Sequence, residues 1–418
     1  MRVWQFIRSR IAVLAAVLVL GGALAWGYSE YGELEPAWGE MGVPMQAVTF
    51  GDLRAVMGCI DCTLLELNPY VESNRCYPLG GRFNLPRAWL WLRFLGANEE
   101  RTNVIGFIYL LLEFTAFALI FRPKRAISNI AVFLTILSPP MLLGMERGNG
   151  DLLIFSLLVI GLALAMRLTL RGRRNAVGWL LTYLTAMKIY PAVAVTAIIR
   201  QRKDIAAAIV IFLAGLAALL LSSWDVLGEV YANTPTTTYL AFGNVNIFVA
   251  MSRFGWFGLT EDFDALRFTA DLVTVLVIAV SAFVARRVAK RRPDFFPRLD
   301  PDDLRDVVTM ATLAEFCIVF CMGSSYYYRL LLLVGGLAGL IKAHDENPRP
   351  LTRFAIVTLT IFFWFSGGMV IWPLWPYFTL VYEPLDWLVF VGAGSWLLVT
   401  LYQRCFGAEN GQAVAVAA

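Results

Sequence analysis

The chain has 418 residues, of which 59% are hydrophobic and 16% charged, with a formal net charge of +4 and a mean hydropathy of +0.65. A soluble domain carries about a quarter charged residues, so the composition excludes an ordinary soluble protein and predicts a helical membrane protein. The basic residues form short clusters scattered between apolar runs, which argues against a nucleic-acid partner. The single histidine, His344, excludes a histidine-based metal site and a Ser-His-Asp relay.

The first apolar run lies in residues 1–26, where basic residues precede it and the small residues Ala23 and Ala25 lie near its end. This pattern is shared by cleavable signal peptides and by retained membrane anchors. We favour a retained anchor, because the loop that follows is predicted to work beside a membrane.

Ten apolar runs are predicted to span the membrane. Loops rich in Lys and Arg face the cytoplasm, and this rule lets all ten spans alternate without conflict and places both termini in the cytoplasm. The basic clusters are Arg2–Arg10, Arg122–Arg125, Arg167–Arg174, Arg200–Lys203, Arg286–Arg292 and Arg349–Arg353. The predicted spans are Ile11–Trp26, Val104–Phe121, Ile127–Leu143, Leu152–Met166, Ile205–Ser222, Leu272–Val284, Val307–Met322, Leu330–Ile341, Phe354–Ile371 and Trp387–Tyr402.

Residues 175–200 do not fit this alternation, because basic residues flank the apolar stretch on both sides. Its centre, Lys188-Ile189-Tyr190-Pro191, contains a proline, which removes a helical hydrogen bond and kinks the chain. The sequence predicts a broken hairpin of two short helices that enters and leaves from the cytoplasm, with its tip inside protein or against a polar cavity. A full span that violates the positive-inside rule is the alternative.

The segments between spans define the predicted loops. Residues 28–101 and 224–267 form two long outside loops, and Pro293–Arg305 links spans on the inside. Residues 405–418 are predicted to be a flexible cytoplasmic tail.

Three of the six cysteines, Cys59, Cys62 and Cys76, share the first outside loop. In an oxidising compartment two of them can form a disulfide, which we favour over free thiols without choosing the pair. Cys59 and Cys62 lack the further ligands that a zinc site needs.

Asp52 is the candidate for acid–base chemistry. The segment from Val48 to Cys59 predicts an amphipathic helix along the membrane surface, because its apolar residues recur close to helical spacing with Asp52 on the other side. A carboxylate fixed there can accept the proton of an attacking hydroxyl. The alternative is a surface carboxylate paired with Arg54 or a nearby arginine.

Glu146-Arg147-Gly148-Asn149-Gly150-Asp151 is squeezed between two predicted spans. Charges at a membrane boundary are costly unless they are solvated or paired. The two glycines allow a close approach of the backbone to a ligand, and Arg147 can bind a phosphate bidentately. A plain interfacial turn is the alternative.

Cations and aromatics mark two more segments. Lys188 and Tyr190 lie at the hairpin tip, where a buried lysine needs an anion such as a phosphate; a lysine that snorkels to water is the alternative. Tyr326-Tyr327-Tyr328-Arg329 ends an outside loop. Its aromatic faces suit sugar rings, although interfacial tyrosines are common in membrane proteins.

Taken in order, these stretches resemble membrane glycosyltransferases of the GT-C class, and glycosyltransferase family 87 in particular. Lys188-Ile189-Tyr190-Pro191 matches the Lys-Ile-Tyr-Pro of the family, and residues 146–151 are similar to its Arg-Gly-Gln-x-Asn turn, with Asn149 and Asp151 at the positions of Gln and Asn. The remaining similar stretches are Gly51-Asp52-Leu53-Arg54, Asn68-Pro69-Tyr70, Phe83-Asn84-Leu85-Pro86 and Phe242-Gly243-Asn244-Val245-Asn246.

The resemblance implies an all-α polytopic membrane protein. Its fold would be a GT-C-like helical bundle with about ten full spans, the broken hairpin, and an extracytoplasmic first loop that carries an interfacial helix. Residues 1–418 would form one glycosyltransferase-like domain of the inner or plasma membrane, with its active site on the extracytoplasmic side.

The activity that the resemblance implies is inverting transfer of a hexose, often mannose, from a polyprenyl-phosphate donor to a lipid or glycan acceptor. Asp52 would be the general base. The donor phosphate would be bound by Arg147, Lys188, Tyr190 and Arg329. The substrate-binding residues would be Arg54, Tyr70, Arg82, Asn84, Arg87, Glu146, Asn149, Asp151, Asn244 and Tyr327.

The sequence lacks a Walker loop, a GxGxxG after a strand, and clustered metal ligands. We therefore expect no cofactor and no metal, and the partners are the sugar donor, the acceptor and membrane lipids. Two alternatives stay open: a transporter or flippase of a lipid-linked or polar solute, and an inactive relative that serves as an assembly subunit.

Overall fold

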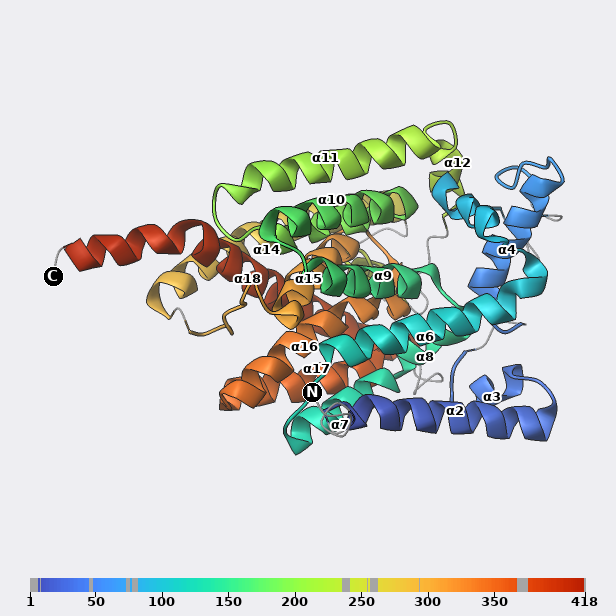
Figure 1. The fold of residues 1–418 in the computed structure, drawn as a ribbon, viewed down its shortest axis with the longest axis horizontal. Helices are drawn as coiled ribbons and strands as arrows, with labels where there is room; N and C mark the ends of the chain where they lie inside the picture. The colour runs from blue at the N-terminus through green and yellow to red at the C-terminus, as the bar shows by residue number, and fades with distance from the viewer. Residues whose placement is uncertain are drawn as a thin grey trace. The chain divides into compact units, whose positions relative to one another are not determined.

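The structure, a computed structural model, is built almost entirely of helices (Figure 1). Its contacts divide the chain into an N-terminal unit, Met1–Ala192 with Phe212–Thr236, and a C-terminal unit, Val193–Ile211 with Thr237–Ala418. The described residues are 7, 9–44, 48–72, 76, 82–234, 241–253, 255, 262–292, 294–366 and 375–416, with only the backbone described in 375–381 and 407–416.

All the regular secondary structure in the described residues of the N-terminal unit is helical. Its elements are α2 (Ile11–Tyr31), α3 (Glu35–Glu40), α4 (Gly51–Leu64), η1 (Arg87–Leu95), η2 (Glu99–Arg101), α6 (Thr102–Ile120), α7 (Ala126–Ile136), α8 (Pro139–Arg147), α9 (Gly150–Ala165), α10 (Leu170–Met187), the greater part of α11 (Asp204–Ser223), and α12 (Leu227–Asn233). Helix α9 packs between α6 and α10, and α2 packs on α7. Helix α4 runs across the direction of α2 and α6 (Figure 1).

The C-terminal unit contains the only strand pair in the described residues. Ala241 of β1 lies opposite Tyr326 of β2, and the two strands are antiparallel. The elements of this unit are β1 (Ala241–Phe242), α13 (Asn246–Arg253), α14 (Phe263–Arg291), α15 (Leu304–Cys321), β2 (Ser325–Tyr326), η5 (Tyr327–Leu330), α16 (Leu331–Glu346), α17 (Pro350–Phe365) and α18 (Trp375–Val416). The 3-10 helix η3 (Tyr190–Ile198) begins in the N-terminal unit and ends in the C-terminal one.

Helices α15 and α16 pack closely because α16 presents glycines to α15. A Cβ atom at Gly335 would lie 2.1 Å from Thr312 Oγ1, and one at Gly339 would lie 2.5 Å from Thr309 Oγ1. Thr309 Oγ1 also donates to the Gly335 carbonyl at 2.8 Å. Small residues spaced four apart are the usual means of bringing two membrane helices into contact.

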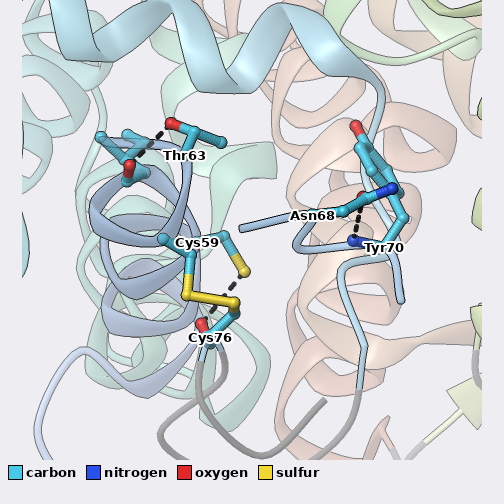
Figure 2. Close-up of a disulfide and its surroundings, with 7 residues drawn as sticks. Cys59, Thr63, Asn68, Tyr70 and Cys76 are labelled. Atoms are coloured by element: carbon cyan, nitrogen blue, oxygen red, sulfur yellow. Dashed lines mark hydrogen bonds between the residues drawn. A yellow bond between two sulfur atoms is a disulfide. The ribbon is translucent and has the colours of Figure 1, made fainter. Parts of the chain in front are cut away.

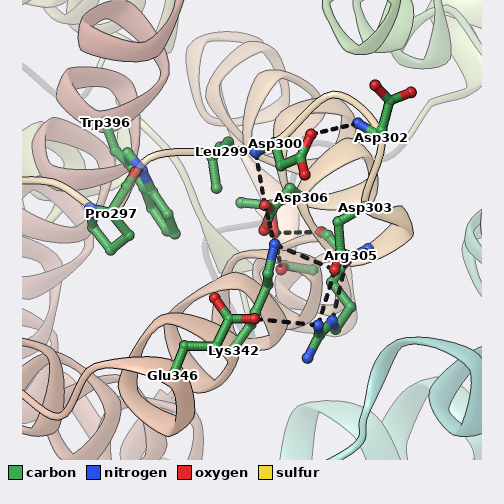
Figure 3. Close-up of polar contacts among 12 residues, drawn as sticks. Pro297, Leu299, Asp300, Asp302, Asp303, Arg305, Asp306, Lys342, Glu346 and Trp396 are labelled. Carbon is green, nitrogen blue, oxygen red and sulfur yellow. Dashed lines mark hydrogen bonds and ion pairs between the residues drawn. The ribbon is translucent and has the colours of Figure 1, made fainter.

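Ion pairs between charged side chains connect one end of α15 to α16 (Figure 3). Lys342 Nζ lies 2.5 Å from Asp306 Oδ2 and 3.2 Å from Asp303 Oδ2. Burial opposes ionisation of Asp303, but the guanidinium of Arg305 outweighs it, so the pKa of Asp303 lies well below its usual range. The linker before α15 joins this end of the unit, since Trp396 Nε1 donates to the Pro297 carbonyl at 2.9 Å.

Among the described residues, five helices are long and apolar enough to cross a membrane, or six if the bent pair α7–α8 forms one span. They are Ile11–Tyr31, Glu99–Ile120, Asp204–Ser223, Phe263–Arg291 and Tyr382–Phe406. The chain is therefore an integral, multi-pass membrane protein, but the prediction of ten full spans is not borne out.

The structure has fewer candidate spans than predicted because several of the helices are too short or too polar. The predicted spans Leu152–Met166, Leu330–Ile341 and Phe354–Ile371 overlap α9, α16 and α17, which have 16 residues each. A perpendicular crossing takes about 20 residues. Helix α15, which covers most of Val307–Met322, has 18 residues and includes acidic and basic side chains. Residues 367–371 lie outside the described residues.

The predicted interfacial helix also differs from the structure. Helix α4 spans Gly51–Leu64 rather than Val48–Cys59, and nine of its 14 residues are buried. It packs against η1, α6 and α8. Its apolar face therefore meets protein, not the membrane surface, and Val48 to Phe50 precede the helix.

The predicted hairpin breaks at the expected place but has different arms. Helix α10 ends at Met187, and Lys188 is extended, with φ −152° and ψ 146°. The second arm, η3, is a 3-10 helix rather than an α-helix. Pro191 lies in its first turn, where a missing N–H costs no hydrogen bond. The placement of residues 175–200 in a membrane stays a prediction.

Two other predicted loops contain regular structure. Residues 224–267 include α12, β1, α13 and the start of α14, and the backbone of α18 runs to Val416 through the predicted tail 405–418. The prediction of one glycosyltransferase-like domain over 1–418 remains untested by the two-unit division.

A disulfide joins Cys62 of α4 to Cys76, which follows α4 in the predicted first outside loop, with Cα atoms 5.3 Å apart (Figure 2). Closing a loop of this length stabilises a fold by about 3 kcal/mol in the chain-entropy treatment. Cys59 is free and buried, and its thiol donates to the Cys76 carbonyl at 3.3 Å. Burial raises the pKa of the Cys59 thiol to about 12, so Cys59 is not a nucleophile at neutral pH.

Candidate active site

Three segments of the N-terminal unit are linked by hydrogen bonds to Asn149 and Asp151. They are the start of α4, the turn between α8 and α9, and the segment that follows α10. Asn149 Nδ2 donates to Asp52 Oδ2 at 2.6 Å. In the same turn, Asp151 Oδ1 accepts from Lys188 Nζ at 2.6 Å. The carboxylate predicted as the base thus touches the turn predicted to bind the donor.

Asp52 lies in the first turn of α4 and is partly buried. The unpaired N–H groups of a helix N-terminus favour a negative charge there. The Asn149 amide fixes one carboxylate oxygen. The same side chain accepts from the Asp151 N–H at 2.9 Å through Oδ1 and so caps α9. Asn149 therefore sets the position of Asp52 relative to the start of α9.

Backbone contacts hold α4 against the turn. Phe50 N donates to the Glu146 carbonyl at 2.8 Å, and Phe50 has a left-handed conformation with φ 57°. Such a conformation in a non-glycine residue costs about 1–3 kcal/mol and persists only where the surroundings enforce it. Glycines make room for the Phe50 ring: a Cβ at Gly106 would lie 2.4 Å from it, and one at Gly148 would lie 3.1 Å from it.

Asp151 organises the cationic side of the site. Its side chain is 2% exposed, and its Oδ1 accepts from Lys188 Nζ and, at 2.7 Å, from the Tyr190 hydroxyl. Lys188 is 12% exposed and Tyr190 4%. A buried lysine requires a compensating charge, and Asp151 supplies it. The extended backbone at Lys188 lets its side chain and that of Tyr190 reach one carboxylate.

Trp89 joins the outside loop to this cluster, and the sequence offered no signal for it. The indole is fully buried, and its Nε1 donates to the Met187 carbonyl at 2.9 Å, just before Lys188. Its ring also covers the start of α9, because a Cβ at Gly150 would lie 2.4 Å from Trp89 Cη2.

This close approach predicts the effect of Gly150→Ala. The added methyl group must displace a buried indole, and such overpacking costs about 1–3 kcal/mol. We expect a lower thermal unfolding midpoint and a reduced activity. Gly22→Ala is the control, since a Cβ there meets nothing within 4 Å. An unfolding midpoint for Gly150→Ala equal to that of Gly22→Ala would contradict the prediction.

Arg147 and Glu146 end α8 beside these residues. Arg147 lies in the last turn, where a cation is favoured by the helix dipole, and it is partly buried. Glu146 is fully buried. Gly148, with φ 58°, then turns the chain toward α9. The predicted turn at 146–151 is therefore a two-residue connection between helices.

Residues 99–299 match the model of glycosyltransferase family 87. The chain carries a glycosyltransferase family 87 domain. The protein is therefore a transferase that uses a sugar donor and an acceptor. No curated protein and no solved structure matches the chain.

The family 87 domain contains Lys188, Tyr190 and the turn at residues 146–151, called the polar turn below. Asp52 precedes the matched range. Asp52 contacts the domain through the hydrogen bond from Asn149, and the neighbouring Phe50 does so through its hydrogen bond to the Glu146 carbonyl. These contacts connect a residue outside the matched range to the domain's own polar turn.

The other candidates in the predicted first outside loop are Arg54, Arg82, Asn84, Tyr70 and Arg87. Arg54 Nη2 donates to Asn103 Oδ1 at 3.4 Å, and Arg54 Nη1 lies 3.7 Å from Glu99, so Arg54 does not pair with Asp52. Arg82 is exposed and Asn84 is partly buried.

Tyr70 and Arg87, two further candidates of this loop, bond to neighbouring residues. Tyr70 is buried, its hydroxyl donates to the Leu85 carbonyl at 3.0 Å, and burial raises its pKa. Arg87 Nη2 forms an ion pair with Asp225 at 2.5 Å.

Three candidates lie in the C-terminal unit. Asn244 is fully buried and its Nδ2 donates to Asp271 Oδ1 at 2.9 Å. Tyr327 is buried against Phe242 and Tyr382. Arg329 Nη1 donates to Ser325 Oγ at 2.9 Å. Among the described residues, no group of three or more His, Cys, Asp or Glu side chains could hold a metal ion.

Proposed function

We propose that this family 87 glycosyltransferase transfers a hexose, mannose in the first instance, from a polyprenyl-phosphate donor to a cell-envelope lipid or glycan. The reaction takes place on the outer face of the membrane, with both termini in the cytoplasm. The observation that carries the proposal is the hydrogen bond from Asn149 to Asp52, because it joins a carboxylate to the turn that holds Arg147 and the Asp151–Lys188 pair.

In the proposed reaction, the acceptor oxygen attacks the anomeric carbon from the face opposite the phosphate. Asp52 accepts the hydroxyl proton, and the bond from the anomeric carbon to the phosphate oxygen breaks, with its electron pair leaving on the phosphate. The configuration is inverted. A positioned general base contributes about 10²–10⁴-fold to such a step.

The leaving phosphate needs positive charge as it departs. Arg147 and Lys188 supply it in the N-terminal unit, and Tyr190 adds a hydroxyl donor. The ion pair with Asp151 holds the lysine in place before the donor binds. Arg329 is the further donor-phosphate candidate that the resemblance implies.

Reconstitution of the purified protein into lipid vesicles tests this function. We expect the isotope-labelled sugar of a polyprenyl-phosphate mannose to appear covalently on cell-envelope acceptors, with inverted configuration by mass spectrometry and NMR. Labelled solute that accumulates inside the vesicles without covalent transfer would support a transporter instead. The absence of both transfer and transport, with a correctly folded protein, would indicate an inactive relative.

A further inference from the structure

A groove of about 310 Å³ opens at the far end of α4 from Asp52, within the N-terminal unit. Thr63 lines it from the helix, and Asn68 and Tyr70 line it from the following loop (Figure 2). Trp91 and Arg93 of η1 line the groove as well. None of the proposed reaction steps uses this groove.

The lining combines an aromatic face with polar donors. Trp91 is 43% exposed, so its indole is available to a ligand. Asn68 Oδ1 accepts from the Tyr70 N–H at 3.0 Å, and the Asn68 amide hydrogens form no hydrogen bond with any described residue. Arg93 is exposed, with its guanidinium 4.8 Å from the centre of the Phe94 ring. A pyranose ring offers an apolar C–H face for the indole and hydroxyl groups for such donors.

The walls of the groove are held before any ligand binds. Asn233 Nδ2 lies 3.4 Å from the carbonyl oxygens of both Tyr70 and Phe83. The Tyr70 and Phe83 rings pack edge to face at 5.3 Å. The Cys62–Cys76 disulfide ties the same loop to α4. A preformed site binds with a smaller ordering cost.

Helix geometry sets the distance from the groove to the proposed base. Asp52 and Thr63 lie on one α-helix, eleven residues apart, which corresponds to roughly 17 Å along its axis. A single hexose is far shorter than this separation. A saccharide that lies in the groove and also reaches Asp52 must therefore contain several sugar units.

We infer that the groove is a remote acceptor subsite, and that the acceptor is an oligosaccharide whose reacting end lies at Asp52 while earlier sugars stack on Trp91. This inference rests on the proposed function, since it assigns the acceptor class for the same transfer reaction. The groove residues bind and align the chain and take no part in bond making.

The test compares acceptors of increasing length, from a monosaccharide through a trisaccharide to a pentasaccharide. For Trp91→Ala we expect KM for the pentasaccharide to rise about tenfold, in line with a stacking contact of about 1.4 kcal/mol, with kcat and the monosaccharide KM unchanged. Arg93→Gln, an exposed position, gives a second variant whose folding is not at risk. Trp179→Ala is the matched control, because Trp179 is 77% exposed on α10 and lies outside the groove.

A direct binding measurement separates this inference from the proposed reaction. Titration of the Asp52→Asn variant with the pentasaccharide is expected to show binding that weakens about tenfold when Trp91→Ala is added. That result supports the subsite even if no transfer is detected with any donor.

Three outcomes would overturn the inference. One is a monosaccharide KM equal to that of the pentasaccharide in the wild-type protein. Another is a Trp91→Ala effect that does not depend on acceptor length. The last is pentasaccharide binding that both groove variants retain. If these variants instead lose binding to anionic lipid vesicles, the groove is a site for membrane lipid.

Discussion

Asp52→Asn is expected to lower kcat for sugar transfer by about 10²–10⁴-fold, the contribution of a positioned general base. The amide cannot accept the hydroxyl proton at neutral pH, although its carbonyl oxygen can still accept the Asn149 hydrogen bond. We therefore expect unchanged expression and unfolding midpoint. Transfer is measured in reconstituted vesicles at saturating donor.

Asp61→Asn is the matched control for this substitution. Asp61 lies on the same helix, and its carboxylate accepts from the Glu99 N–H at 2.9 Å, a bond that an asparagine oxygen can also accept. We expect nearly wild-type transfer from this variant. Wild-type turnover by Asp52→Asn would remove the proposed mechanism, as would an equal loss of activity in both variants.

Removing one charge of the buried Asp151–Lys188 pair should lower the free energy of unfolding more than any other substitution proposed for this protein. Either Asp151→Asn or Lys188→Met leaves one charge in a site where the pair is only 2% and 12% exposed. Loss of one partner from a buried ion pair costs about 3–5 kcal/mol. We expect both single variants to unfold at much lower temperature in detergent.

The double variant Asp151→Asn/Lys188→Met distinguishes structure from catalysis. It removes both charges, so we expect it to be more stable than either single variant. Transfer should nevertheless stay low, because the cation proposed to meet the leaving phosphate is absent. Recovery of transfer together with stability would show that Lys188 has a structural role only.

An exposed ion pair serves as the reference for the single and double variants of Asp151 and Lys188. Arg298 lies 3.1 Å from Asp294, and the two side chains are 70% and 64% exposed. Exposed pairs contribute about 0–1 kcal/mol, so Arg298→Gln should barely change the unfolding midpoint. A loss as large as that of Lys188→Met would mean that the assay does not report on burial.

Composition and motif order were sufficient to predict the class of protein. The apolar content indicated an integral membrane protein, and Lys188-Ile189-Tyr190-Pro191 with the turn at 146–151 indicated family 87, which the match over residues 99–299 bears out. The break after α10 also falls at the predicted proline motif. These features could be predicted because each depends on residue types and spacings within a short stretch of sequence.

The structure shows fewer candidate spans than the ten that were predicted, for a related reason. Hydropathy reports how apolar a segment is, but a buried helix of a membrane protein is as apolar as one that faces lipid. Helices α9 and α17 are apolar and too short to cross on length alone. The same ambiguity made α4 resemble a helix on the membrane surface, whereas its apolar residues face protein.

Composition and motif resemblance predicted a membrane transferase and identified Asp52, the turn at residues 146–151 and Lys188 as separate candidates. The contacts between these candidates are visible only in the folded chain. Asp52 and Asn149 are 97 residues apart, and Asp151 and Lys188 are 37 apart, yet each pair is joined at 2.6 Å. Periodicity shows which face of a helix is apolar, whereas the partner of that face depends on long-range packing, such as the fit of Phe50 against Gly106 and Gly148.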